Sequence, residues 1–258
     1  MSNTNRWIAL IPLAEPVLPS FVEVERAFQN RFPDATPPSD PGGTERLLTC
    51  SLGEAAASVT LIDRPIPPAQ LGGPCAAAWY WPTAAAELDD HPAHLMLTMV
   101  DEGGSATDRA LAFTRWTAAV AAASESLGVF WGPSRTIHRP GDFLDQAVQS
   151  GPRNLPLYLW IDFRIEPVAN HAGGADFHRL YTTGLATLGQ DEIEVANFTG
   201  APQSLLESAY NVAHYLLDRK QAVNDGDTIG LSDEVQLTAR RAPSMLGGEL
   251  EVIRLEWD

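Results

Sequence analysis

The residues best suited to carry chemistry lie close together near position 90. Asp89 and Asp90 directly precede His91, and His94 follows three residues after it. Imidazole nitrogens and carboxylate oxygens are ligands that Zn²⁺ accepts in proteins. In an extended segment the two imidazoles would lie on opposite faces, whereas one helical turn would bring them together. We therefore predict His91 and His94 as a candidate metal site, although no third ligand can be assigned. Capping of a helix or strand is the alternative role.

Three consecutive aromatic residues, Trp79, Tyr80 and Trp81, form the second candidate site. They lie in a segment rich in proline and glycine, 64–92, for which no regular element can be delimited beyond a short helix. Large aromatic side chains in such a segment either anchor it to the core or form an exposed patch. If they are exposed, they suit a protein partner, because Trp and Tyr dominate binding hot spots.

Acidic residues form the third candidate site. Asp191, Glu192 and Glu194 follow closely on Gly189. We predict them as binding residues. Together with Asp162 and Glu166 they could supply paired carboxylates for acid–base chemistry, and a solvated acidic rim is the alternative.

The chain lacks the sequence signatures of common catalytic sites. It contains no G-x-S-x-G elbow, no P-loop and no Rossmann glycine pattern. Cys50 and Cys75 fit no metal-ligand spacing, so we expect buried, reduced thiols. We predict no catalytic residue and no cofactor.

The charge of the chain limits its partners. Seventeen Lys and Arg against 33 Asp and Glu give a formal net charge of −16. Such a charge repels nucleic-acid backbones and anionic membranes, and it favours solubility or a basic protein partner. The apolar runs are too short for a membrane span or a signal segment. We therefore expect a soluble protein of the bacterial cytoplasm that binds a protein, with no nucleic-acid or membrane partner; its oligomeric state stays open.

The elements that position these residues centre on segment 107–132. Ser105 and Asp108 can cap a helix whose apolar face recurs at steps of three and four, and Gly128 can end it in the left-handed conformation. Strand 129–131 should follow. Other predicted strands are 7–13, 46–51, 57–63, 93–100, 157–166, 180–187, 192–198, 235–240 and 249–257. Another predicted helix begins at a capping box of Ser20 and Glu23 and ends at Pro33, and a third covers 142–149. A capping box of Ser204 and Glu207 predicts a further helix from Ser204 onward, and 34–43 should be a loop.

This order of elements predicts an α+β fold with mixed or antiparallel sheets and helices packed on them. Strand-helix-strand-strand blocks occur early and late, which is compatible with two ferredoxin-like halves. We expect a single compact domain over 1–258, with sub-halves 1–150 and 151–258 as a finer division.

Several segments together resemble a known family. They are Trp79-Tyr80-Trp81-Pro82, His91-Pro92-Ala93-His94, Thr114-Arg115, the run 127–132, Thr183-Gly184-Leu185 with the run 189–194, and the run 225–230. In this order they resemble the bacterial family called domain of unknown function 4261, over roughly 7–257. The resemblance implies an architecture and a loose association with secretion and toxin neighbourhoods, but no catalytic residues.

We therefore expect a non-enzymatic, acidic, protein-binding protein. An immunity or accessory factor for a secreted bacterial toxin is one such role. The alternative is a metal-dependent hydrolase that uses the His/Asp cluster, and a third is a structural protein that self-associates through 79–81.

Overall fold

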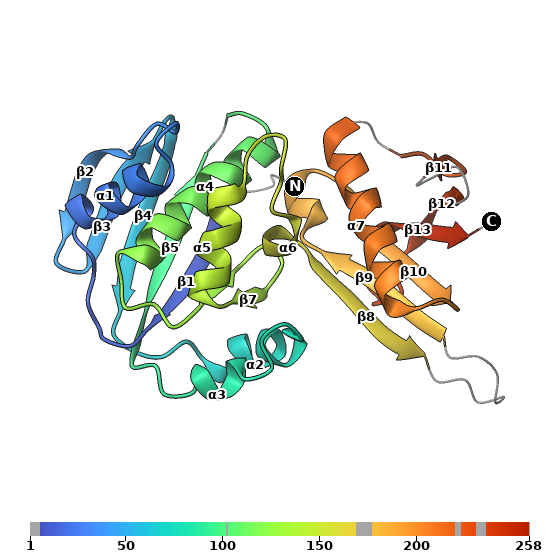
Figure 1. The fold of residues 1–258 in the computed structure, drawn as a ribbon, viewed down its shortest axis with the longest axis horizontal. Helices are drawn as coiled ribbons and strands as arrows, with labels where there is room; N and C mark the ends of the chain where they lie inside the picture. Colours follow the sequence, from blue (N-terminus) through green and yellow to red (C-terminus); the bar gives the residue numbers. More distant parts are fainter. Residues whose placement is uncertain (1–5, 102, 169–176, 220–222, 231–235, 258) are drawn as a thin grey trace. The chain divides into compact units, whose positions relative to one another are not determined.

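The computed structural model describes residues 6–101, 103–168, 177–219, 223–230 and 236–257. The chain divides into two compact units, Met1–Trp160 and Ile161–Asp258. Each unit contains one β-sheet with helices packed on it (Figure 1).

Unit 1 is built on a seven-stranded sheet of order β2-β3-β4-β5-β1-β6-β7, in which all neighbours are antiparallel. The interior strand β1 is buried along nearly its whole length. The strands are β1 (Arg6–Leu13), β2 (Ser39–Thr44), β3 (Leu47–Leu52), β4 (Ala55–Ile62), β5 (Ala93–Val100), β6 (Val129–Trp131) and β7 (Thr136–His138).

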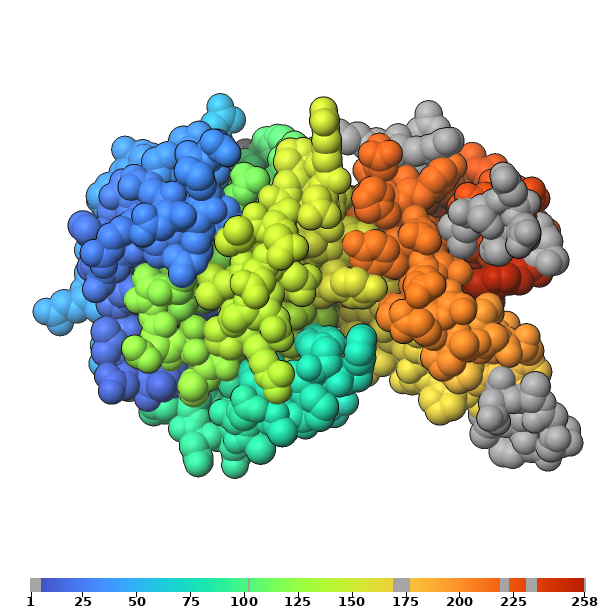
Figure 2. All heavy atoms as spheres, in the orientation of Figure 1, coloured from blue at the N-terminus to red at the C-terminus, as the bar shows by residue number. Residues whose placement is uncertain are grey.

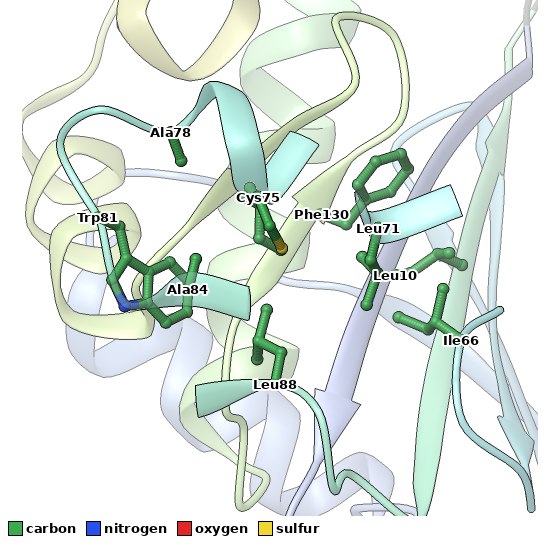
Figure 3. Close-up of a cluster of buried hydrophobic side chains, with 10 residues drawn as sticks. Leu10, Ile66, Leu71, Cys75, Ala78, Trp81, Ala84, Leu88 and Phe130 are labelled. Atoms are coloured by element: carbon green, nitrogen blue, oxygen red, sulfur yellow. The ribbon is translucent and has the colours of Figure 1, made fainter. Parts of the chain in front are cut away.

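Helices cover both faces of this sheet. On one face α4 (Ala106–Ala122) packs against β1, where Trp7 contacts Phe113, and it is flanked by α1 (Phe21–Arg31) and α5 (Pro140–Gln149). On the other face α2 (Pro68–Ala77) and α3 (Ala84–Glu87) pack on Leu10 and Phe130 (Figure 3). Because neighbouring strand residues point to opposite faces, β1 and β6 contribute to both layers.

Unit 2 is built on a six-stranded sheet of order β11-β12-β13-β10-β9-β8. Its neighbours are antiparallel except β10 and β13, which run parallel. Helix α7 (Pro202–Arg219) packs on β8 and β10, and the 3-10 helix η1 (Leu185–Leu188) precedes β10. The strands are β8 (Asp162–Val168), β9 (Phe177–Thr183), β10 (Ile193–Phe198), β11 (Thr228–Gly230), β12 (Gln236–Pro243) and β13 (Glu251–Trp257).

The predicted α+β class is confirmed, and the strand orders define its topology. In unit 1 the strand that follows α1 is β2, and three strands, β3, β4 and β5, lie between it and β1, whereas a split β-α-β unit has one strand between its two parallel strands. In unit 2 three strands precede α7 and three follow it. Both arrangements thus differ from the ferredoxin-like order.

Most predicted elements are present where the sequence signals are strong. Strand 93–100 is found with those bounds, and α1 carries the predicted capping box between Ser20 and Glu23. Helix α4 begins after Ser105, whose hydroxyl accepts the Asp108 N–H at 3.1 Å. Segment 64–92, predicted as irregular, contains both α2 and α3.

The predicted end of the central helix at Gly128 is wrong. Helix α4 ends at Ala122, where Ser124 donates its hydroxyl to the Val120 carbonyl and so satisfies the last turn. The chain that follows α4 pairs with the end of β1, where the Leu127 N–H donates to the Pro12 carbonyl. Gly128 does not adopt a positive φ. A Cβ at Gly128 would lie 3.3 Å from the Trp81 ring, so the glycine makes room for that side chain.

Three further element predictions need correction. Segment 157–166 is divided: Leu157–Trp160 forms a helical turn, α6, that buries its two leucines and Trp160, and the strand begins at Asp162. A short apolar run cannot distinguish the two structures by period alone. Helix α7 begins at Pro202, so Ser204 lies inside the helix instead of capping it. The predicted loop 34–43 contributes the exposed edge strand β2.

Among the described residues, no helix is long and apolar enough to cross a membrane.

Candidate functional site

The three predicted aromatic residues occupy three different environments. The side chain of Trp81 is fully buried, Tyr80 is 36% exposed and Trp79 is 70% exposed. Trp81 belongs to the apolar cluster between α2, α3 and the sheet (Figure 3). The two predicted alternatives, core anchor and exposed patch, therefore each apply to a different residue of the triplet.

Contacts from the segment 137–139 hold this aromatic turn, 79–81, in place. The Tyr80 hydroxyl donates to the Ile137 carbonyl at 3.0 Å, and the Tyr80 ring stacks on His138 with centroids 5.6 Å apart. The Arg139 guanidinium lies over the Trp81 ring, 5.6 Å from its centroid. The rings of Trp79 and Tyr80 pack edge to face, with their centroids 5.7 Å apart. The exposed Trp79 side chain therefore extends from a turn that is held in place by these contacts, which we call the support of the aromatic turn.

His138 is a buried titratable group within this support. Its side chain is buried, and its Nε2 lies 3.0 Å from the Thr136 hydroxyl. Burial lowers the pKa of His138 to about 4, against a smaller opposing effect of a backbone hydrogen bond with Leu159. His138 is therefore neutral at pH 7.

The surface around Trp79 has an unusual composition. Between Pro65 and Ala86 the sequence contains no Asp, Glu, Lys, Arg or His. Its outward residues on α2 and α3 are small, and this segment (teal) lies at the surface of unit 1 (Figure 2). We call the exposed side of 65–86 the α2–α3 surface; Gly72, Gly73, Ala76, Trp79, Tyr80, Ala85 and Ala86 are exposed on it.

Acidic residues border this uncharged surface. Glu87, Asp89 and Asp90 follow it directly and are exposed. Glu87 is paired with Arg139 at 3.9 Å, whereas Asp89 and Asp90 form no ion pair with another of the described residues. An apolar patch with a charged rim is typical of surfaces that bind other proteins.

The predicted metal ligands are engaged in structural hydrogen bonds. His91 accepts the Ile66 N–H at Nε2, 2.7 Å away, and its Nδ1 donates to the Leu88 carbonyl at 2.5 Å. His94 donates from Nδ1 to the Arg64 carbonyl at 2.8 Å, and burial lowers its pKa. Both histidines are buried and fix the segment that leads into α2.

A metal ion at His91 would have to displace one of these hydrogen bonds. Among the residues that the structure describes, no group of three or more His, Cys, Asp and Glu is placed to hold a metal ion. Cys50 and Cys75 are both buried, and burial raises the pKa of the Cys50 thiol to about 12.

The predicted acidic residues of unit 2 are built into its framework. Glu192 is buried and accepts hydrogen bonds from the Thr182 hydroxyl at 2.7 Å and the Gly184 N–H at 2.8 Å. Glu194, also buried, accepts from the Ser244 hydroxyl at 2.6 Å and pairs with Arg254 at 3.3 Å. These two carboxylates therefore do not form a solvated rim.

The remaining predicted carboxylates have basic neighbours. Asp191 pairs with Arg241 at 2.8 Å and Asp162 with Arg164 at 2.7 Å. Glu166 accepts from Arg179, which lowers its pKa, and from the Tyr181 hydroxyl at 2.9 Å. Asp162 and Glu166 lie in β8 and the others in or beside β10, so they do not converge on one site.

Sequence reasoning did not single out His138 and Arg139, which support the aromatic turn. The Arg139-Pro140 pair does mark a helix start, because proline is favoured at the first helical position. Nothing local in the sequence, however, links position 138 with Tyr80.

The family predicted from the motifs is confirmed over the C-terminal part of the chain. Residues 181–256 match the model of a family described as Domain of unknown function (DUF4261). The matched residues lie within unit 2 and include Glu192 and Glu194, whereas the aromatic turn and the two histidines lie outside them. No curated protein and no solved structure matches the chain.

Proposed function

We propose that the protein works by binding another protein through the α2–α3 surface, and that it is not an enzyme. The observation that carries this proposal is Trp79, which is 70% exposed. Burying a large aromatic side chain on association gives a large gain in free energy, and Trp is the residue most enriched in binding hot spots.

The support under Trp79 strengthens the proposal. Because Tyr80 and Trp81 are held by His138, Arg139 and the core, the backbone of the turn loses little entropy when a partner binds. Preorganisation of this kind raises affinity without adding contacts.

The charge of the chain supports a basic partner. A net charge of −16 attracts a positively charged protein over a long range. Asp89 and Asp90 place negative charge directly beside the apolar surface. A basic secreted toxin would fit, and the protein would then be its immunity or accessory factor. A metal-dependent hydrolase has less support, since the ring nitrogens of His91 are already hydrogen bonded.

The proposal can be tested by affinity capture from the source organism. Tagged wild-type protein, Trp79→Ala and the control Val22→Ala, whose side chain is 67% exposed on α1, are compared by quantitative mass spectrometry. We expect wild type and the control to retain a basic protein in stoichiometric amount. Trp79→Ala should retain at least about tenfold less, since a hot-spot truncation costs about 2 kcal/mol or more. Capture should also weaken as salt is raised from about 50 mM to 500 mM, because the added ions screen the attraction between the two charged proteins. Over this range the Debye length shortens from roughly over 10 Å to under 5 Å.

Two results would contradict the proposal. One is equal capture of the same protein by wild type and Trp79→Ala. The other is self-association of the purified protein through Trp79, seen by light scattering, which would favour a structural role.

A further inference from the structure

A small cavity opens beside the α2–α3 surface. It has a volume of about 190 Å³ and lies between α2, α3 and the segment that precedes α2. Its walls are largely apolar and include Ile66, Pro68, Leu71, Cys75 and Leu88. The cavity therefore offers an apolar surface on which an apolar group could be buried.

Two polar residues complete the lining, and they differ in whether their polar atoms can interact with a ligand. His91 has both ring nitrogens in hydrogen bonds with backbone groups, so it presents only the sides of its ring. Asp89 is exposed and contributes a carboxylate at the edge. Burial raises the pKa of the Cys75 thiol, which keeps it neutral and unreactive. The cavity thus combines apolar walls with one negative charge.

We propose that this cavity receives one apolar side chain of the partner, with a neighbouring Lys or Arg of that partner directed to Asp89. This inference rests on the proposed function. The volume supports a side chain over a free ligand, because small-molecule sites usually enclose about 300–1,000 Å³. Charge complementarity with Asp89, and with the net charge of −16, selects a basic neighbour. Trp79, in the turn between α2 and α3, and the cavity between these helices would then be two anchors for one partner.

Two helical glycines provide a matched pair of variants. A Cβ added at Gly72 or at Gly141 would meet no atom within 4 Å, so both positions accept a side chain. Gly72 lies in α2 and Gly141 in α5, and neither has a positive φ, so Gly→Leu should favour the helix at either site. Gly72 lines the cavity, whereas Gly141 lies outside both the cavity lining and the α2–α3 surface. Gly72→Leu should therefore obstruct the cavity, and Gly141→Leu is the control.

The test uses full-length protein and synthetic peptides, followed by NMR. The probe peptide has one Leu flanked by Lys on both sides; in one control Ala replaces Leu, and in another Glu replaces each Lys. We expect the Leu–Lys peptide to shift the signals of Leu71 and Leu88, and each control peptide to bind at least about tenfold more weakly. Gly141→Leu should bind like wild type, and Gly72→Leu should not bind, while both variants keep a wild-type melting temperature or higher.

Several outcomes would overturn this inference. They are an absence of shifts with the Leu–Lys peptide, equal binding by Gly72→Leu and Gly141→Leu, or equal binding of the Leu and Ala peptides. Binding of a free apolar molecule, such as indole, in preference to the peptide would make the cavity a small-ligand site and would also overturn it. The proposed function is tested separately by Trp79→Ala, whose effect does not depend on these peptides.

Discussion

At the scale of single residues, the aromatic turn shows how similar side chains take opposite roles. Trp81 fills the core between α2, α3 and the sheet, whereas Trp79, two positions earlier, is directed outward. The backbone leaves α2 at Ala78 in a non-helical conformation, so neither the helix period nor the strand period applies across the triplet. For this reason the sequence identified the triplet but could not assign the role of each ring.

The two tryptophans should differ sharply in their effect on stability. Trp81→Ala removes a fully buried indole and leaves a cavity, so we expect a loss of about 3–5 kcal/mol in the free energy of unfolding. Trp79→Ala should change it by less than about 0.5 kcal/mol, since the side chain is mostly exposed. Urea denaturation of both variants measures the difference. Equal losses would mean that Trp79 is also a core residue.

His138 should make stability depend on pH. Its pKa is lowered to about 4 by burial, so between pH 6.5 and 4 the unfolded chain binds a proton that the folded protein does not. Stability should therefore fall as the pH falls through this range, by about 3 kcal/mol in total from this group. The contribution should be fully present above pH 6.5.

The variant His138→Phe isolates this effect from other titrating groups. It keeps an aromatic ring beside Tyr80 but cannot take up a proton. The stability of wild type relative to the variant should decline steadily from pH 6.5 to pH 4.5 in denaturation experiments. If the free energies of unfolding of wild type and His138→Phe changed with pH in parallel, the lowered pKa of His138 would be contradicted.

At the scale of elements, Glu194 joins three parts of unit 2. It lies in β10, pairs with Arg254 of β13 and accepts the Met245 N–H at 3.0 Å in the turn after β12. Removing one partner of a buried ion pair leaves the other charge uncompensated. We expect Glu194→Ala to cost about 3–5 kcal/mol of stability.

The control for Glu194 is Glu256, in the same sheet. It forms an exposed ion pair with Arg240, and such pairs contribute little. Glu256→Ala should therefore have a much smaller effect in the same chemical denaturation experiment. If both variants lost equally little stability, Glu194 would not connect the strands as described.

Elements with local signals could be predicted from the sequence, and those set by distant contacts could not. The capping boxes and the apolar run of β5 placed α1, the start of α4 and β5 correctly. The end of α4 depends instead on pairing between Leu127 and Pro12, which are far apart in the sequence. Likewise, the hydrogen bonds of His91 and His94 to 64–66 cannot be deduced from their spacing.

At the scale of the whole molecule, two features define the protein: two compact units and a strongly acidic charge. Charge and fold class follow from composition and element order, so the sequence predicts both. The order of strands in each sheet does not, because it depends on which strands meet in space. The residues that match the DUF4261 family model lie in unit 2, whereas the surface proposed to bind a partner belongs to unit 1. The binding residues of this chain are therefore proposed outside the matched residues.

The most direct test of this account is oxidative footprinting of the wild-type protein, alone and in complex with the captured partner. Trp79 is 70% exposed, so it should be oxidised readily in the free protein and protected several-fold in the complex. Exposed residues of unit 2, such as Leu246, should be oxidised equally in both samples. Protection that maps to residues 181–256 while Trp79 stays reactive would contradict the account.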